Sequence, residues 1–586
     1  MSVDTEVLRT ASFEGSSRRN SDLARTVEAV APGLAGLLLA IPVLVAYYPP
    51  MTDLPFHEGA IGVLRHFSDT TMFPPGLYER NLGHPNQLFH VIGWALSYVV
   101  STRWAVKLVV AATVMAIPIA AARFARHVGA SPLAALLVSP LALGWLFAWG
   151  LVTNLLGLAL LLALIPALDR LAEAPSGRRS VAAVLASVLL YFAHGAMMAA
   201  YAGAALGLAL LYPWSKRKTP LRLAPFVVGV ALALAEAMRV KHLDTAAVRA
   251  IPSVWHTVGH KLLHIPYMLL PATDGVVYTA MFGLCVLIVG LFFWLRWRER
   301  RQVALQRLPS ATERHGVQAW AVGHRWEIFA LACLAAYLAF PLTLHGATLV
   351  YQRWFPPGFA VLVVVAAPRD LWTRDGRVAR FAVALFPMAT LLVAWPSFVD
   401  SDRQYLALEQ ALPYVERGSG VVGIDLGPHD PSRTFTLSAA AGRILATRGG
   451  RLAYAFTDSP ISPVFIPRRF QWSEALLRLG FDSFSLRPAH DLRRFRYVLL
   501  HVNDPGLAQL ATSLLQPEAD HIMTSGEWVL LRSHSETLPL ASREGRIMGP
   551  PPENLRDRLI LSVKEGTGRL PERPPDAPGF DPIHRY

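Results

Sequence analysis

The sequence predicts an α-helical polytopic membrane protein with a small C-terminal α/β domain. Long uncharged apolar segments recur through the first 400 residues, whereas charged residues and short β-like runs become frequent after Asp400. Of the 586 residues, 53% are hydrophobic and 16% are charged. Soluble domains carry about 25% charged residues, so the composition indicates a membrane protein.

The net charge of +14 arises from 55 Lys and Arg residues against 41 Asp and Glu residues. Most of this excess lies in short loops between apolar segments, where basic residues set the orientation of a membrane protein. The charge therefore predicts no nucleic-acid partner. Cys285 and Cys333 both lie inside apolar segments, so they predict neither a disulfide nor a zinc site.

Residues 1–30 are polar and basic and are expected to form a cytoplasmic N-terminal segment. They lack the small-residue cleavage site of a signal peptide, so we expect the first apolar segment, Ala31–Tyr48, to be retained as a span. Basic loops stay in the cytoplasm, so this span runs outward into a first loop of residues 49–103. The short apolar stretch Gln87–Val100 is expected to lie at the outer face without crossing.

The alternation of basic loops and apolar segments predicts about eleven transmembrane helices within a domain of residues 31–399. The N-terminus is then cytoplasmic and the C-terminal domain extracytoplasmic, an arrangement suited to a bacterial inner membrane. After Ala31–Tyr48 the predicted spans are Trp104–Ala122, Leu133–Trp149, Val152–Leu168, Val181–Met197, Ala199–Tyr212, Leu223–Met238, Val276–Leu295, Ile328–Leu344, the short Phe359–Ala367, and Phe381–Phe398.

Residues 400–535 are expected to form the small extracytoplasmic α/β domain. Apolar runs at Gly420–Asp425, Tyr497–His501 and Glu527–Leu531 read as strands, and helical patterns lie between them. Residues 536–586 are rich in Pro and Arg and weakly apolar, which predicts a polar, disordered tail.

The most informative motif is Asp-Leu-Pro-Phe-His-Glu at residues 53–58, directly after the first span. Ionisable groups at such a place suggest function. Asp53 is the candidate general base, His57 lies one helical turn on as a possible helper, and Glu58 is the reserve base. The alternative role for Asp53 is a helix N-cap before Leu54 and Pro55.

Other polar and aromatic residues are predicted to gather on the same outward face. Arg, Lys and His can hold a phosphate and stabilise its charge as it leaves, and aromatic rings can stack on a sugar. Simpler roles stay open for several of them, including packing, membrane anchoring and closure of a helix turn. The candidates for substrate binding are His84, Trp149, Asn154, His194, Lys241, Tyr351 and Arg353.

Three histidines, His256, His260 and His264, recur every four residues in the long loop before the eighth predicted span. Imidazoles at this spacing can share a metal ion on one helix face. No cysteine or clear carboxylate accompanies them, so we favour a polar helix face lying on the membrane, and no metal ligand is assigned.

The sequence resembles the GT-C superfamily of integral membrane glycosyltransferases, and within it an uncharacterised bacterial branch. The first span leads directly into the acidic outward motif at residues 52–58, and an outward α/β domain follows the last span. The chain lacks an Asp-x-Asp pair in the first loop and the signature of oligosaccharyltransferases. The remaining matching segments are Pro74-Pro75, His84-Pro85-Asn86, the turn Phe147–Gly157 and the run Tyr351–Pro357.

The resemblance implies transfer of a sugar, with inversion, from a polyprenyl-phosphate donor to the hydroxyl of a lipid, glycan or protein acceptor. The first-loop aspartate of the family acts as base, and Asp53 is the matching residue here. Arg353 and Lys241 are the candidates for the phosphate, and a divalent cation stays open as a cofactor. Two other functions stay open: a glycolipid transporter or flippase, and an inactive GT-C-like assembly or binding protein.

Overall fold

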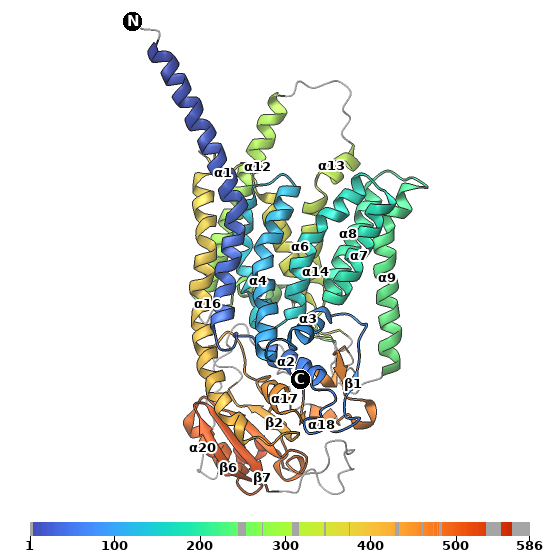
Figure 1. Ribbon diagram of the computed structural model, residues 1–586, viewed down its shortest axis with the longest axis vertical. Coiled ribbons are helices and arrows are strands. Elements are labelled where there is room, and N and C mark those ends of the chain that lie inside the picture. The colour runs from blue at the N-terminus through green and yellow to red at the C-terminus, as the bar shows by residue number, and fades with distance from the viewer. Residues whose placement is uncertain are drawn as a thin grey trace.

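The computed structural model has a bundle of helices at one end and a β-sheet at the other (Figure 1). The first helix extends from the end of the bundle that is farther from the sheet. The structure describes residues 4–243, 253–271, 274–306, 316–344, 347–373, 375–427, 433–459, 461–472, 474–477, 479, 483–534 and 553–564.

A helix lies at each of the eleven predicted membrane-spanning segments. Within the described residues, six helices are long and apolar enough to cross a bilayer. The other segments form shorter helices, so the total number of spans stays a prediction. The six long helices are α1 (Asp4–Val45), α4 (Thr102–His127), α6 (Val152–Glu173), α9 (Lys218–Leu243), α12 (Gly275–Gln306) and α16 (Arg377–Ala411).

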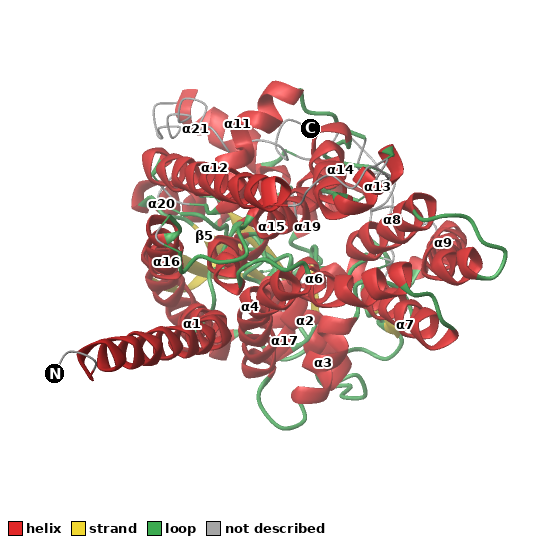
Figure 2. Cartoon of the chain, turned by 90° about the horizontal axis from the view of Figure 1, so that it is seen from above, coloured by secondary structure: helices red, strands yellow, loops and turns green. Residues whose placement is uncertain are grey.

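The shorter helices complete the bundle. Seen from above, α7, α8 and α9 form one side of the bundle, and α1 and α16 lie on the opposite side (Figure 2). The shorter helices are η1 (Pro132–Ala142), α5 (Trp145–Ala148), α7 (Gly177–Ala193), α8 (Gly195–Leu211), α11 (Val258–Leu269), α13 (Val317–Gly323), α14 (Arg325–Ala339), η2 (Tyr351–Trp354) and α15 (Phe355–Ala366).

The third predicted span differs most from expectation. Its main part is the 3₁₀ helix η1, in which every residue is buried, with Pro132 at its start and Pro140 inside. Proline lacks a backbone N–H and disrupts a regular α-helix, which accounts for the irregular form. This segment is therefore enclosed by α1, α4 and α16 and does not face lipid.

The first loop folds back under the bundle. It contains α2 (Leu54–Arg65), the short strand β1 (Glu79–Arg80) and α3 (Leu88–Leu96). Helix α3 has nine residues and is about 14 Å long, too short to cross a bilayer, as expected for this stretch. Helix α2 is buried from Leu54 to Leu64, which is unusual for a loop helix and indicates that protein covers all its sides.

The C-terminal part contains a mixed five-stranded sheet with the strand order β3-β2-β5-β7-β6. Strand β2 pairs in parallel with β3 and β5, while β7 pairs antiparallel with β5 and β6. All three predicted strands are present. The strands are β2 (Gly420–Asp425), β3 (Arg451–Leu452), β5 (Tyr497–His501), β6 (Ala519–Ser525) and β7 (Trp528–Ser533), and the helices are α17 (Gly442–Arg448), α18 (Glu474–Leu477), α19 (Pro488–Asp491) and α20 (Pro505–Leu515).

The C-terminal part is joined to the rest of the protein in three ways. Helix α16 has 35 residues, about 52 Å, and runs from the bundle down to the sheet (Figure 1). Strand β1 of the first loop pairs with β4 (Val464–Phe465). Helix α17 packs on α2 so closely that a Cβ added at Gly62 would lie 2.7 Å from the Cα of Ala446. The first loop therefore lies between the bundle and the sheet.

The prediction of a disordered tail is wrong for one segment. Leu555–Lys564 forms helix α21, which packs against α20 and buries Leu555 and Leu559. Arg558 also forms an ion pair of 2.8 Å with Glu518. These few apolar positions stabilise a helix despite the polar composition of the segment. The rest of the predicted tail lies outside the described residues.

Candidate functional site

Asp53 is held in place by the turn between α5 and α6. The backbone N–H of Thr52 donates to the carbonyl of Ala148 at 2.9 Å, and that of Asp53 donates to the carbonyl of Trp149 at 3.1 Å. Gly150 has φ +75°, and a Cβ there would lie 2.5 Å from the Asp53 nitrogen. Only glycine fits both the left-handed backbone and this close approach.

The Asp53 side chain does not cap the helix that follows it. Asp53 precedes α2 with φ −89° and ψ −7°, and its carboxylate accepts no capping hydrogen bond. Asp53 therefore occupies the N-cap position, as the alternative interpretation expects, but its side chain makes no capping bond. Its carbonyl accepts the first helical bonds instead, from the N–H groups of Phe56 and His57.

Asp53 and Arg353 form the electrostatic centre of the site. Burial raises the pKa of Asp53 to about 7, and the positive charge of Arg353 acts in the opposite direction. Burial lowers the pKa of Arg353 to about 10, and Asp53 raises it. A carboxylate that titrates near neutral pH suits a general base, because it is ionised yet still takes up a proton readily.

The Arg353 guanidinium is only partly satisfied by protein. Its Nη1 lies 3.1 Å from His194 Nε2, and its Nη2 donates to the Thr348 carbonyl at 3.1 Å. Its Nε is buried and has no hydrogen-bond partner among the described residues. An arginine in this state retains a donor for an anionic ligand.

His194 and Asn154 belong to the same region. His194 lies between α7 and α8 and is buried, and a Cβ on Gly157 of α6 would be 2.8 Å from its Cβ. Asn154 lies one turn earlier on α6 and is 1% exposed. Neither polar atom of its side chain has a hydrogen-bond partner within the described part of the chain. A buried amide without partners costs free energy, and a polar ligand would satisfy it.

His57 pairs with another histidine and not with Asp53. Its Nδ1 lies 2.8 Å from His90 Nε2, and both rings are buried. Burial lowers the pKa of His57 well below its ordinary value and that of His90 to about 4. His57 is therefore a neutral residue supporting the base of the site, and the structure shows no hydrogen bond from its ring to Asp53 among the described residues.

Glu58 is enclosed in a buried ion-pair network and is poorly placed as a reserve base. It is fully buried, accepts hydrogen bonds from Tyr48 at 3.0 Å and Thr102 at 2.8 Å, and forms an ion pair with Arg443 of α17. Arg443 also pairs with Glu409. Both oxygens of Glu58 are occupied, so its placement indicates a structural role.

The other candidates make separate contacts. His84 is buried with its ring Nε2 3.1 Å from the carbonyl of Ser462, so it joins the first loop to the C-terminal part. Tyr351 is buried in η2, and its hydroxyl lies 3.1 Å from His256 Nδ1. Trp149 supplies the carbonyl that holds Asp53. The side chain of Lys241, at the end of α9, lies outside the described residues.

No metal centre is evident. Among the described residues, no group of three or more His, Cys, Asp and Glu side chains is arranged to hold an ion. The three regularly spaced histidines instead contact one another: the rings of His256 and His260 meet edge to face with centroids 4.3 Å apart, and those of His260 and His264 stack with centroids 5.9 Å apart.

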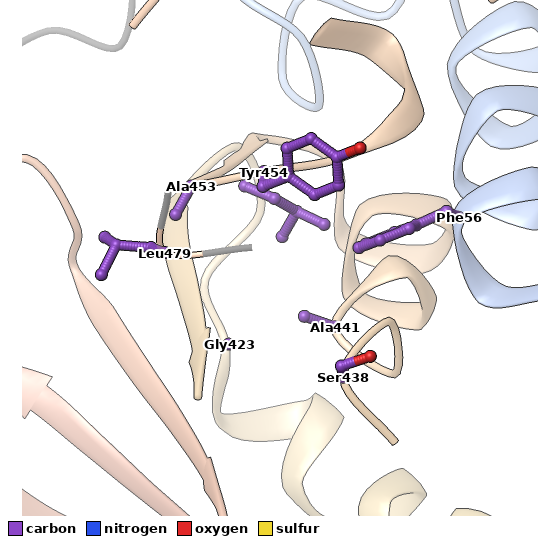
Figure 3. A pocket seen from close by; sticks show the side chains of 8 residues that line it. Phe56, Gly423, Ser438, Ala441, Ala453, Tyr454 and Leu479 are labelled. Carbon is purple, nitrogen blue, oxygen red and sulfur yellow. The ribbon is translucent and has the colours of Figure 1, made fainter. Parts of the chain in front are cut away.

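Sequence reasoning missed two parts of the site. Gly150 lies inside the turn between two predicted spans, and a glycine between Trp149 and Leu151 was the available signal. Tyr454 comes from the C-terminal part, 401 positions after Asp53, and no local pattern marks it. It lines a small pocket with Phe56 and Ser438, between α2 and the sheet (Figure 3).

Neither a family model nor a curated protein matches the sequence. The structure is similar to that of ArnT from Cupriavidus metallidurans bound to undecaprenyl phosphate, with a TM-score of 0.50 and 10% identity over 87% of this chain and 99% of that chain. The apo form of ArnT gives a TM-score of 0.49, 11% identity and coverage of 89% and 100%. An oligosaccharyltransferase from Archaeoglobus fulgidus gives a TM-score of 0.38 and 12% identity over 87% of this chain and 74% of that chain.

The likeness to the undecaprenyl phosphate complex of ArnT shows the fold. The chain is a multi-pass membrane protein with the GT-C fold, which confirms the resemblance seen in its sequence. At 10% identity the likeness assigns no role to individual residues, and these are argued from the site itself.

Proposed function

We propose that the protein is a membrane glycosyltransferase that moves a sugar from a polyprenyl-phosphate donor to an acceptor hydroxyl on the outer face of the membrane. The observation that carries this proposal is the electrostatic interaction of Asp53 with Arg353, in which each group shifts the pKa of the other. The donor class is supported by the likeness to ArnT, whose structure contains bound undecaprenyl phosphate.

In the proposed reaction Asp53 takes the proton from the acceptor hydroxyl. The oxygen of that hydroxyl forms a bond to the anomeric carbon, and the bond from this carbon to the phosphate oxygen breaks. The lipid phosphate leaves with the bonding electron pair. Arg353 neutralises its growing charge, and the amide of Asn154 and the N-terminus of α6 lie in the same region as further donors.

The direct test is Asp53→Asn, which keeps the size of the side chain and removes the base. Purified protein in lipid vesicles receives radiolabelled undecaprenyl-phosphate sugars, and native membranes lacking the protein supply the acceptor. We expect a fall in transfer of at least about 100-fold, the usual effect of losing a general base. Undiminished transfer by the variant would remove Asp53 as base. Passage of the donor across the vesicle wall without transfer would favour a flippase.

Orientation is tested separately with thiol labels. Ser68 in the first loop and Lys216 between α8 and α9 are both exposed, whereas the native Cys285 and Cys333 are buried. In intact cells, an impermeant maleimide should label Ser68→Cys and leave Lys216→Cys unlabelled. The reverse pattern would place Asp53 on the cytoplasmic side and exclude the proposed reaction on the outer face.

A further inference from the structure

A short segment of the C-terminal part, Tyr454–Asp458, lies across the first turn of α2. Its two aromatic rings contact the residues that follow Asp53. The ring centroids are 5.7 Å apart for Phe56 and Tyr454, 5.4 Å for Phe56 and Phe456, and 4.7 Å for His57 and Phe456. The segment therefore brings the sheet region up to the proposed base.

This placement is fixed on both sides. Before Asp53, the hydroxyl of Thr52 accepts a hydrogen bond of 3.0 Å from the Thr436 backbone. After Asp53, Gly442 of α17 is in direct contact with the backbone of Pro55, with no room for a Cβ. Close packing of this kind resists rigid-body movement, so Tyr454 stays beside α2.

The segment is also rigid in itself. Asp458 accepts a hydrogen bond of 3.0 Å from the backbone N–H of Ala455 and closes a 3₁₀ turn directly after Tyr454. The backbone of Ile466 donates to the Thr457 carbonyl at 2.8 Å, which ties the turn to β4. Preorganised groups of this kind bind without a large ordering cost.

Tyr454 brings a specific chemistry to this place. Burial and the negative charges of Asp53 and Asp458 hold the pKa of its phenol far above the ordinary value. The hydroxyl therefore keeps its proton at any working pH and serves as a hydrogen-bond donor. Its ring borders the pocket shown in Figure 3, beside Phe56.

We propose that Tyr454 is an acceptor-positioning residue, whose hydroxyl donates a hydrogen bond to the acceptor while Asp53 removes its proton. The inference rests on the proposed function. Arg353, His194 and Asn154 come from elements of the membrane bundle, where a lipid-borne donor arrives. Tyr454 comes from the C-terminal part, outside the long apolar helices, so a group that this part contributes beside the base is placed for the other substrate.

The test separates the two substrates. Transfer is measured from radiolabelled undecaprenyl-phosphate glucose, mannose, galactose and arabinose, with a detergent extract of native membranes lacking the protein as acceptor. The donor is varied at fixed extract, and the extract at fixed donor. Tyr454→Phe is expected to raise the amount of extract that gives half-maximal transfer about tenfold, which is the effect of losing one hydrogen bond. The donor concentration that gives half-maximal transfer should stay within about twofold of the wild-type value.

Tyr414→Phe is the matched control, because Tyr414 is 55% exposed in the same part of the chain. It should behave as the wild type. Tyr454→His keeps a donor on a planar ring and should recover part of the affinity for the extract. Should Tyr454→Phe fail to fold, the His variant tests the same contact.

The inference is overturned if Tyr454→Phe matches Tyr414→Phe, or if only the donor constant changes. In either case loss of transfer by Asp53→Asn would leave the proposed function intact. Absence of transfer by the wild type from all four donors would overturn the proposed function and this inference together.

Discussion

Gly150 and Asp53 are in backbone contact, with the Asp53 nitrogen 2.5 Å from the position that a Cβ on Gly150 would occupy. A methyl group there must push Asp53 away from the carbonyl of Trp149 or distort the turn. The site of the proposed base is therefore set by a residue that offers no functional group of its own.

Gly150→Ala is expected to lower the free energy of unfolding by about 2–4 kcal/mol, about 1 for the positive φ and 1–3 for the forced contact. Transfer should fall together with stability. Gly129→Ala is the matched control, because Gly129 has φ +66° with nothing within 4 Å of the added methyl group. Chemical unfolding in detergent measures both variants, and equal losses would show that the contact with Asp53 is unimportant.

The rate of transfer should rise with pH through about 7, because Asp53 must be ionised to accept a proton and its pKa is about 7. Arg353→Gln removes the positive charge that lowers this pKa, so the midpoint should move to higher pH. The exposed Arg417 provides the control, and Arg417→Gln should leave the midpoint unchanged. A profile that is flat between pH 5 and 9 in the wild type would contradict the assignment.

Asp53 should also make stability depend on pH. Its pKa is about 7 in the folded protein, whereas the ordinary pKa of an aspartate is 3.8, so between these two values the folded state holds a proton that the unfolded state has lost. Rising pH through this window therefore weakens folding. Asp53→Asn is expected to raise the unfolding temperature at pH 8 and to leave it nearly unchanged at pH 4. An equal effect at both values would show that the carboxyl group titrates normally.

Glu58→Gln is expected to cost about 3–5 kcal/mol of stability, because it leaves Arg443 with a weakened partner in a fully buried place. Glu409→Gln removes the charge of the other partner of Arg443. The Glu409 side chain is 25% exposed, so this substitution should lower the free energy of unfolding by clearly less. Unfolding curves in detergent give both values. A stable Glu58→Gln protein without transfer would instead identify Glu58 as the base.

Asn154→Leu tests the unpartnered amide. Its polar atoms have no partners among the described residues, so an apolar side chain of similar size should leave stability unchanged or increase it. The donor concentration that gives half-maximal transfer should rise about tenfold for each lost hydrogen bond. Asn86→Leu is the contrast, because Asn86 accepts a hydrogen bond from Gly195 at 2.9 Å and should lose stability. A clear loss of stability in Asn154→Leu would indicate a structural role.

Much of the bundle follows from hydropathy, because a lipid-facing helix must satisfy its own backbone and therefore leaves a long apolar signal. The sequence also marked Asp53 and Arg353 individually, since an ionisable group beside an apolar segment is conspicuous. It failed for η1, whose complete burial by protein gives the same apolar pattern as a lipid-facing span.

Contacts between distant parts of the chain left no local trace. In the sequence Glu58 reads as a second acid of the motif, because its partner Arg443 lies 385 positions away. Tyr454 stands in an ordinary run after a short strand, and the packing of the C-terminal part on α2 brings it beside Phe56. Residue spacing predicts which side chains share one face of a helix, but it does not predict which helix faces pack against each other.

The position of α2 beneath α17 has a consequence for synthesis of the chain. The first loop emerges early, yet its buried carboxylate at Glu58 meets its cation only after residue 443 has been added. Until then the loop has an unpaired charge that resists burial. A product truncated before α17 therefore lacks the partner of Glu58 and the packing around α2, so the surroundings of Asp53 form only after residue 443 has been added.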